Sequence, residues 1–201
     1  MDPYVQKLWH YRELLHGELP VPARLTIEWL LVSAVRKHTH LKPQASPWDT
    51  VEKPHIVTVA NDVLEQAVTL MGAQFGVMQL YVSPQDTLLM IAERNFAPEF
   101  ADRFACFTPD GRTACSRALA SQRRVIVDDV ANDELFAPHA DAALSAGFHS
   151  LQATPVIRSS GEVVGIITTH YAAPHGIQKD RFGRLDEYVR DAAPQILAAC
   201  A

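Results

Sequence analysis

Four polar side chains alternate with apolar ones along two neighbouring stretches of the segment HSLQATPVIRSSGEVVGIITTHY. They are Gln152, Thr154, Thr168 and His170. Side chains of a strand alternate between its two sides, so the first two share a side, and so do the last two. If the stretches pair as a hairpin with Ser160-Gly161 at its tip, we expect all four to lie side by side. They would then line the hydrogen-bonding floor of a ligand cavity, satisfy one another as a buried network, or face solvent.

Two further side chains are candidates for the same site. Gln79 lies on a strand expected at Val77–Ser83 and would extend the polar floor. Cys115 is expected to start a helix, where the positive end of the helix dipole lowers the pKa of a thiol. We therefore place both near the rim of the cavity, with Cys115 either a redox-sensing thiol or a small buried residue.

His170 has the widest choice of chemistry among these residues. A histidine beside threonines could bind an anion or a metal, or change its charge near neutral pH. The next histidine, His175, is separated from it by Pro174, and no second ligand stands at a standard metal spacing. We expect no native metal site, and the sequence identifies no cofactor. Walker A, GxGxxG and GxSxG motifs do not occur, so no catalytic residue is predicted.

The composition is that of an ordinary globular protein, with 48% hydrophobic and 20% charged residues in a chain of 201. The formal net charge of −5 argues against a nucleic-acid binder. The longest apolar helical candidate, Leu25–Val35, contains Glu28 and is too short to span a bilayer. No signal peptide is visible, and three cysteines without a CxxC pair fit a reducing compartment. We expect a cytoplasmic protein without membrane partners.

From residue 55 onward, apolar periodicity predicts the order helix, two-strand hairpin, helical crossover, strand, helix, two-strand hairpin, helix. The expected helices span 55–71, pieces of 98–121, part of 134–146 and 178–199, and the expected strands span 77–83, 88–94, 124–128 and the late hairpin. This order predicts an α+β fold with a mainly antiparallel central sheet flanked by helices. Residues 1–54 are expected to form an N-terminal helical pair and linker, and residues 55–201 the main domain.

Three runs, GVMQLYVSPQDTLLMIAERNF, GRTACSRALASQRRVIVDDVANDELF and AGFHSLQATPVIRSSGEVVGIITTHY, resemble the GAF domain family in order and spacing. The resemblance covers roughly residues 55–198 and is nearest to GAF sensors of bacterial signalling proteins. It implies a GAF/PAS-like antiparallel sheet of about six strands, with a helical dimer or signalling surface on one side and a small-molecule pocket on the other. Both faces of such a sheet are covered, which weighs against a solvent-facing polar stripe.

Other activities of GAF relatives need residues that this sequence lacks. The resemblance to free methionine-(R)-sulfoxide reductases includes Cys106 and Cys115, but the loop DELFAPHADAALSAG lacks the catalytic cysteine of that family. Bilin-binding members commonly have a histidine soon after the attachment cysteine, and neither cysteine fits. Cyclic-nucleotide-binding members carry Asn-Lys before Phe-x-x-x-Asp-Glu, and only the second half occurs, from Phe182. A haem group would need an axial ligand, for which His139 and His149 are the candidates.

These observations predict a regulatory sensor domain that binds a small molecule or responds to redox state. It would signal through helix packing or dimer contacts, as a homodimer or with a signalling protein partner. Two alternatives stay open. One is a thiol-based reductase that uses Cys106 and Cys115, and the other is a pure interaction module with a vestigial pocket.

Overall fold

The computed structural model of the protein describes residues 6, 10, 27–31, 54–82, 86–107 and 109–200. Most of the helical pair and linker expected within 1–54 lies outside these residues. In the helical stretch at 27–31, Ile27 and Leu31 are buried in the same apolar cluster as the helices that cover the sheet. No helix in the described part of the chain is long and apolar enough to cross a membrane.

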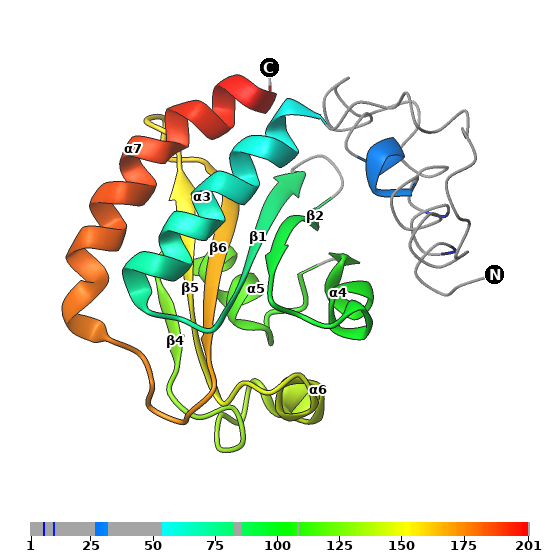
Figure 1. The fold of residues 1–201 in the computed structure, drawn as a ribbon, viewed down its shortest axis with the longest axis vertical. Helices are drawn as coiled ribbons and strands as arrows, with labels where there is room; N and C mark the ends of the chain where they lie inside the picture. Colours follow the sequence, from blue (N-terminus) through cyan, green and yellow to red (C-terminus); the bar gives the residue numbers. More distant parts are fainter. Residues whose placement is uncertain are drawn as a thin grey trace.

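A single six-stranded antiparallel sheet forms the centre of the described structure (Figure 1). Its strands follow the order β3-β2-β1-β6-β5-β4, so the first and last hairpins of the chain meet at β1 and β6. The strands are β1 Phe75–Val82, β2 Thr87–Arg94, β3 Cys106–Phe107, β4 Val125–Val127, β5 Ser150–Ile157 and β6 Val163–Tyr171. The predicted α+β class and mainly antiparallel sheet are confirmed. Strand β3 was not predicted, because two residues are too short to show a period.

Two long helices, α3 His55–Met71 and α7 Phe182–Cys200, lie next to each other over one face of the sheet (Figure 1). Helix α3 buries an apolar side that includes Leu64 and Val68. It is capped at its C-terminus by Gly72, whose φ of 59° is the left-handed conformation that glycine adopts readily. The sequence predicted both helices, and α7 begins four residues later than expected because Lys179–Arg181 forms the separate 3₁₀ turn η4.

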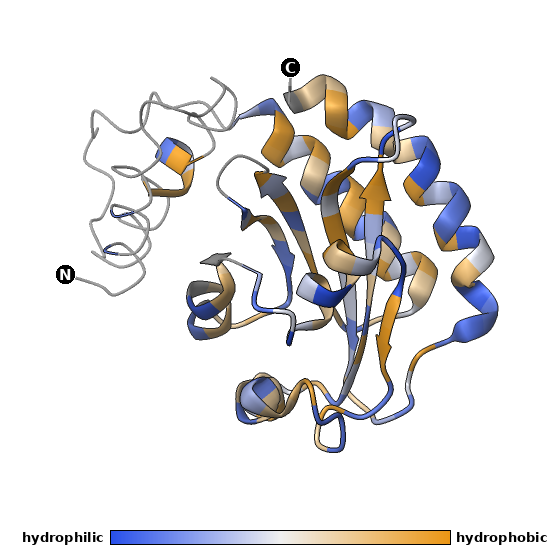
Figure 2. Ribbon diagram, turned by 180° about the vertical axis from the view of Figure 1, so that it is seen from behind, coloured by the Kyte–Doolittle hydropathy of each residue, from blue (hydrophilic) through white to orange (hydrophobic). Residues whose placement is uncertain are grey.

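Short helices cover the opposite face of the sheet (Figure 2). They are α4 Pro98–Phe104, α5 Ala114–Ser121, the 3₁₀ turn η3 Ala137–His139 and α6 Ala140–Ser145. Helix α5 is capped at its N-terminus by Thr113, whose side-chain oxygen accepts a hydrogen bond from the backbone N–H of Ser116 at 3.2 Å. The sheet therefore separates two apolar cores: a helix-side core beneath α3 and α7, and a second core beneath α4, α5 and α6.

A bulge in the late hairpin decides which side chains enter which core. Ile157 pairs with Val163, but Val156 pairs with Gly165. The register therefore shifts by one residue, and Val164 has no residue of β5 directly opposite it. A one-residue shift moves every following side chain of one strand to the other face relative to its partner strand. Without this bulge, the turn at 158–162 would bring Gln152 opposite Thr168.

The expectation that Gln152, Thr154, Thr168 and His170 share one face is therefore wrong. Gln152 pairs with Thr169 and Leu151 pairs with His170. The bulge places the polar residues of β5 on the helix side of the sheet, and Thr168 and His170 of β6 on the opposite side. The sequence predicted the hairpin correctly, but the bulge divides the four polar residues between the two faces of the sheet.

Candidate functional site

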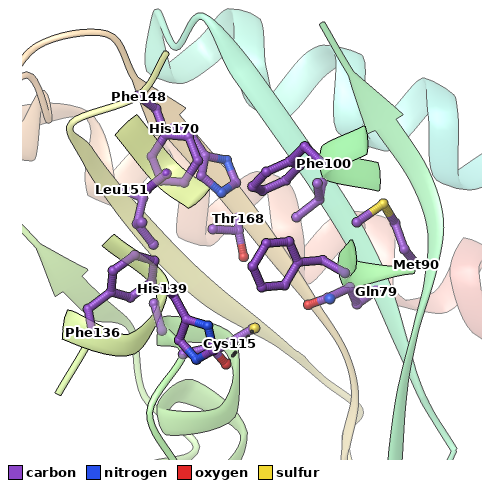
Figure 3. A pocket seen from close by; sticks show the side chains of 15 residues that line it. Gln79, Met90, Phe100, Cys115, Phe136, His139, Phe148, Leu151, Thr168 and His170 are labelled. Carbon is purple, nitrogen blue, oxygen red and sulfur yellow. Dashed lines mark hydrogen bonds between the residues drawn. The ribbon is translucent and has the colours of Figure 1, made fainter. Parts of the chain in front are cut away.

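A cavity lies between β1, β2, β5 and β6 on one side and α4, α5 and α6 on the other (Figure 3). It has about 40 Å³ of space for the centres of water-sized molecules, within about 440 Å³ of empty volume that includes its opening to solvent. Four phenylalanine side chains line it, namely Phe100, Phe104, Phe136 and Phe148. The polar side chains that line it are Gln79, Thr113, Cys115, His139, Thr168 and His170. An apolar cavity with a few placed polar groups is the usual form of a small-molecule site.

The polar atoms of this cavity are incompletely bonded. Among the described residues, seven buried side-chain nitrogen or oxygen atoms lack a hydrogen-bond partner, and five of these belong to cavity residues. The five atoms are Gln79 Oε1, Thr168 Oγ1, His170 Nδ1 and both ring nitrogens of His139. Buried polar atoms are nearly always hydrogen-bonded to protein or water. Their concentration around one space indicates that water or a ligand completes the site.

His170 is enclosed by aromatic rings. Its ring centroid lies 4.7 Å from that of Phe148 and 5.0 Å from that of Phe96, in edge-on geometry. Figure 3 shows its ring between Phe148 and Phe100. Burial lowers the pKa of His170 to about 3, and a backbone hydrogen bond with Phe75 acts in the opposite direction but is the smaller effect. At neutral pH this side chain is therefore uncharged and available for hydrogen bonding.

Cys115 lines the cavity from the first turn of α5. Although the residue as a whole keeps partial exposure, dehydration of its thiol raises the pKa to about 11, against the smaller effect of a contact with Thr113 Oγ1 at 3.1 Å. The sequence correctly placed Cys115 at the start of a helix. The expected lowering of its pKa is wrong, because loss of water around the thiolate outweighs the helix dipole.

We expect Cys115 to react slowly with alkylating reagents. A pKa raised from 9.0 to about 11 leaves about a hundredfold less thiolate at any pH below both values. Timed iodoacetamide labelling at pH 7.5, followed by peptide mass spectrometry, should show about hundredfold slower modification of Cys115 in the folded protein than in urea. Equal rates in the two states would contradict the buried, protonated thiol.

His139 faces the cavity from the 3₁₀ turn before α6. Its Nε2 lies 3.5 Å from Asp110 Oδ2, an ion-pair distance that is too long for a good hydrogen bond. Phe104 and Phe136 contact its ring edge-on, with centroids 5.9 and 5.7 Å away. His139 was only a candidate haem ligand in the sequence and was not among the predicted pocket residues, since the loop at 133–147 has no period that would orient it. His149 does not line the cavity.

The polar residues of β5 form a separate network on the helix side of the sheet. Gln152 Nε2 donates to Thr169 Oγ1 at 3.0 Å, and Thr154 Oγ1 donates to Gln152 Oε1 at 2.6 Å. Arg124 Nε donates to both Gln152 Oε1 and Thr154 Oγ1, at 3.1 and 3.0 Å. Its guanidinium also pairs with Asp186 of α7. Gln152 and Thr154 therefore satisfy one another, as the structural-network alternative predicted, and tie β4 and β5 to α7.

The predicted site is thus divided. Gln79, Cys115, Thr168 and His170 line the cavity, and Gln152 and Thr154 do not. The aromatic wall was missed, although Phe96, Phe100 and Phe104 recur every four residues, a spacing that places them on one side of a helical segment. Among the described residues, no group of three or more His, Cys, Asp or Glu side chains could hold a metal ion.

The fold and the cavity together define an α+β domain with a long-helix layer on one face of the sheet and a pocket on the other. The sequence model of the GAF domain family matches residues 55–193. The chain therefore belongs to the GAF domain family, whose members are commonly ligand-binding signalling domains. A comparison with curated proteins found no significant match.

Solved structures share this fold at low sequence identity. A GAF domain/HD domain protein from Geobacter sulfurreducens is 12% identical, with a TM-score of 0.60 over 73% of this chain and 94% of that one. A domain of a two-component sensor histidine kinase protein from Sinorhizobium meliloti 1021 is 16% identical, with a TM-score of 0.56 over 72% and 92%. A type II free methionine-R-sulfoxide reductase from Thermoplasma acidophilum is 15% identical, with a TM-score of 0.54 over 71% and 94%. These likenesses concern the fold alone.

Proposed function

We propose that this chain is a ligand-sensing regulatory domain. A small molecule occupies the cavity, and its binding changes the packing of α3 and α7. The observation that carries the proposal is the gathering of five buried polar atoms without a hydrogen-bond partner around one apolar space, one of which, His139 Nε2, lies at ion-pair distance from Asp110. A purely structural core would leave few such atoms, and they would not converge.

Strand β6 provides a direct route from the cavity to the helix layer. Thr168 and His170 face the cavity, while Thr169 and Tyr171, which alternate with them, face the helices. The Thr169 hydroxyl contacts Gln152 Nε2 at 3.0 Å and the Tyr171 hydroxyl at 3.1 Å. Arg124 continues this network to Asp186 of α7 and lies 4.1 Å from the centroid of the Phe182 ring. A ligand that displaces β6 slightly would disturb the hydrogen bonds of Thr169 and, through Gln152 and Arg124, the contact with α7.

Binding without turnover has more support than thiol chemistry. The raised pKa of Cys115 leaves roughly one thiolate in ten thousand at pH 7, far from the lowered pKa of reactive cysteines. The structural likeness to a methionine sulfoxide reductase remains, but the loop at 133–147 contains no cysteine. Because the Cys115 thiol is protonated at neutral pH, we also propose ligand binding rather than redox sensing as the primary signal.

The homodimer and the signalling protein partner expected from the sequence belong to this proposal as receivers of the signal. Both would contact the layer formed by α3 and α7, since the other face is used by the cavity. The net charge of −5 supports the expectation that neither nucleic acid nor an anionic membrane is the partner.

A pair of adjacent threonine variants tests the proposal. Metabolites, nucleotides and tetrapyrroles would be screened by thermal shift, and hits followed by hydrogen exchange of α7. We expect Thr168→Val to weaken binding of a hit about tenfold, because one hydrogen bond in the cavity is lost. Thr169→Val is the matched control on the opposite face, and it should keep the affinity within about threefold while reducing the exchange response of α7.

Two results would remove the proposal. One is a library in which no compound stabilises the protein. The other is a hit whose affinity is unchanged in Thr168→Val and in His170→Ala, because such a compound would bind elsewhere.

A further inference from the structure

The cavity already contains an aromatic ring of the protein itself. Phe100 reaches into it from α4, a helix of seven residues that follows Ala97 without a side-chain cap. Its ring stacks on Phe96 with a centroid distance of 4.0 Å and an interplanar angle of 17°. It meets Phe148 and His170 edge-on, at 5.6 and 6.3 Å. Figure 3 shows its ring beside that of His170.

The remaining space is too small for an aromatic ligand while Phe100 stays in place. About 40 Å³ for water centres accommodates a few water molecules, at roughly 10–15 Å³ each. A cavity that holds benzene is on the order of 150 Å³. Phe100 is only partly buried, so its ring can leave without unfolding the sheet. Its departure would leave a flat slot bounded by Phe96, Phe148 and His170.

The chemistry of the walls restricts what could fill this slot. The described residues that line the cavity include no Lys, Arg, Asp or Glu. The same dehydration that keeps His170 neutral would act on any charged group placed beside it. Gln79 Oε1 needs a hydrogen-bond donor, and the Thr168 hydroxyl can donate or accept. Their strands are adjacent, so both can meet one edge of a bound molecule.

We propose that the cavity takes a neutral, planar heteroaromatic compound that replaces the Phe100 ring and presents an adjacent donor and acceptor to Gln79 and Thr168. This inference rests on the proposed ligand-sensing function and names the chemical class of the ligand. The ring would stack on Phe96, and its edges would meet Phe148 and His170 as those of Phe100 do now. Amide-like ring edges, with N–H beside C=O, match the unpartnered atoms.

Four probes of similar size separate these requirements. They are 2-pyridone, benzene, benzoate and benzylammonium, each titrated into wild type and Phe100→Ala and followed by heteronuclear NMR. We expect Phe100→Ala to bind 2-pyridone at least tenfold more tightly than wild type, with Phe100→Leu in between. Benzoate and benzylammonium should bind Phe100→Ala at least tenfold more weakly than 2-pyridone. Val82→Ala, on β1 in the helix-side core and outside α3 and α7, controls for general loosening and should leave the affinity unchanged.

The polar edge is tested within the opened cavity. Adding Thr168→Val to Phe100→Ala, or to Phe100→Leu if the alanine variant does not fold, should weaken 2-pyridone about tenfold and leave benzene within twofold. The inference is overturned if a charged probe binds as tightly as 2-pyridone, or if removing the Phe100 ring gives no gain. A charged metabolite that stabilises wild type through Thr168 would end this inference while leaving the proposed sensor function intact.

Discussion

Gly165→Ala is expected to destabilise the protein by about 3 kcal/mol or more, because the added methyl group would collide with the backbone of the neighbouring strand β1. A β-carbon at this position would lie 2.5 Å from the backbone oxygen of Gln79, a distance that real contacts do not reach. The obstacle is backbone, so no side-chain rotation can relieve it. Urea denaturation followed by circular dichroism should show the loss as a lower midpoint at an unchanged slope.

The matched control is Gly183→Ala, the same substitution in the first turn of α7. A β-carbon there meets no atom within 4 Å, and the residue is exposed. Alanine is favoured over glycine in helices, so stability should be unchanged or raised by up to about 1 kcal/mol. Equal midpoints for Gly165→Ala and wild type would contradict the observed pairing of β1 with β6.

The second large effect is a loss of stability on mild acidification that depends on His170. Its folded-state pKa is about 3, against 6.5 for a histidine exposed to solvent in the unfolded chain, so between these values the unfolded state binds more protons. Stability from this residue is complete above pH 6.5 and falls as the pH drops toward 3. The expected slope is about 1.4 kcal/mol per pH unit, and His170→Phe should lack it.

The difference between wild type and His170→Phe isolates this effect from the carboxylates. Asp110 and Asp129, whose pKa values are lowered, also reduce stability in acid, but they do so in both proteins. Unfolding free energies at pH 7, 6, 5.5 and 5 should show the stability gap changing by about 1.4 kcal/mol per unit below pH 6.5. Parallel curves for the two proteins would show that His170 gains access to water when it is protonated.

Much of the architecture could be predicted from the sequence, because periodicity reports directly on burial. The apolar sides of α3 and α7, and the β-branched arms of β5 and β6, each follow one period over many residues. The short elements around the cavity could not be located as well. Strand β3 and helix α6 have two and six residues, too few for a repeat to emerge.

The candidate site shows where pattern reasoning stops. Thr168 and His170 could be assigned to one face of β6, but their relation to Gln152 depended on a bulge that no periodicity reveals. Gly165 was the available signal, because a glycine inside a strand often marks a bulge or a close backbone approach. The direction of the Cys115 pKa shift depended on burial, which helix position alone does not give.

The alternation of side chains along β6 has a consequence for dose response. Thr168 and Thr169 are neighbours in sequence, yet one faces the cavity and the other the helix layer. If occupancy of the cavity shifts α7 between two arrangements, thermodynamic reciprocity requires that fixing α7 shifts the ligand affinity by the same factor. An assembly that holds α7 would thereby set the concentration threshold of the domain. The same pocket would then respond at different ligand concentrations, depending on which partner is bound to α7.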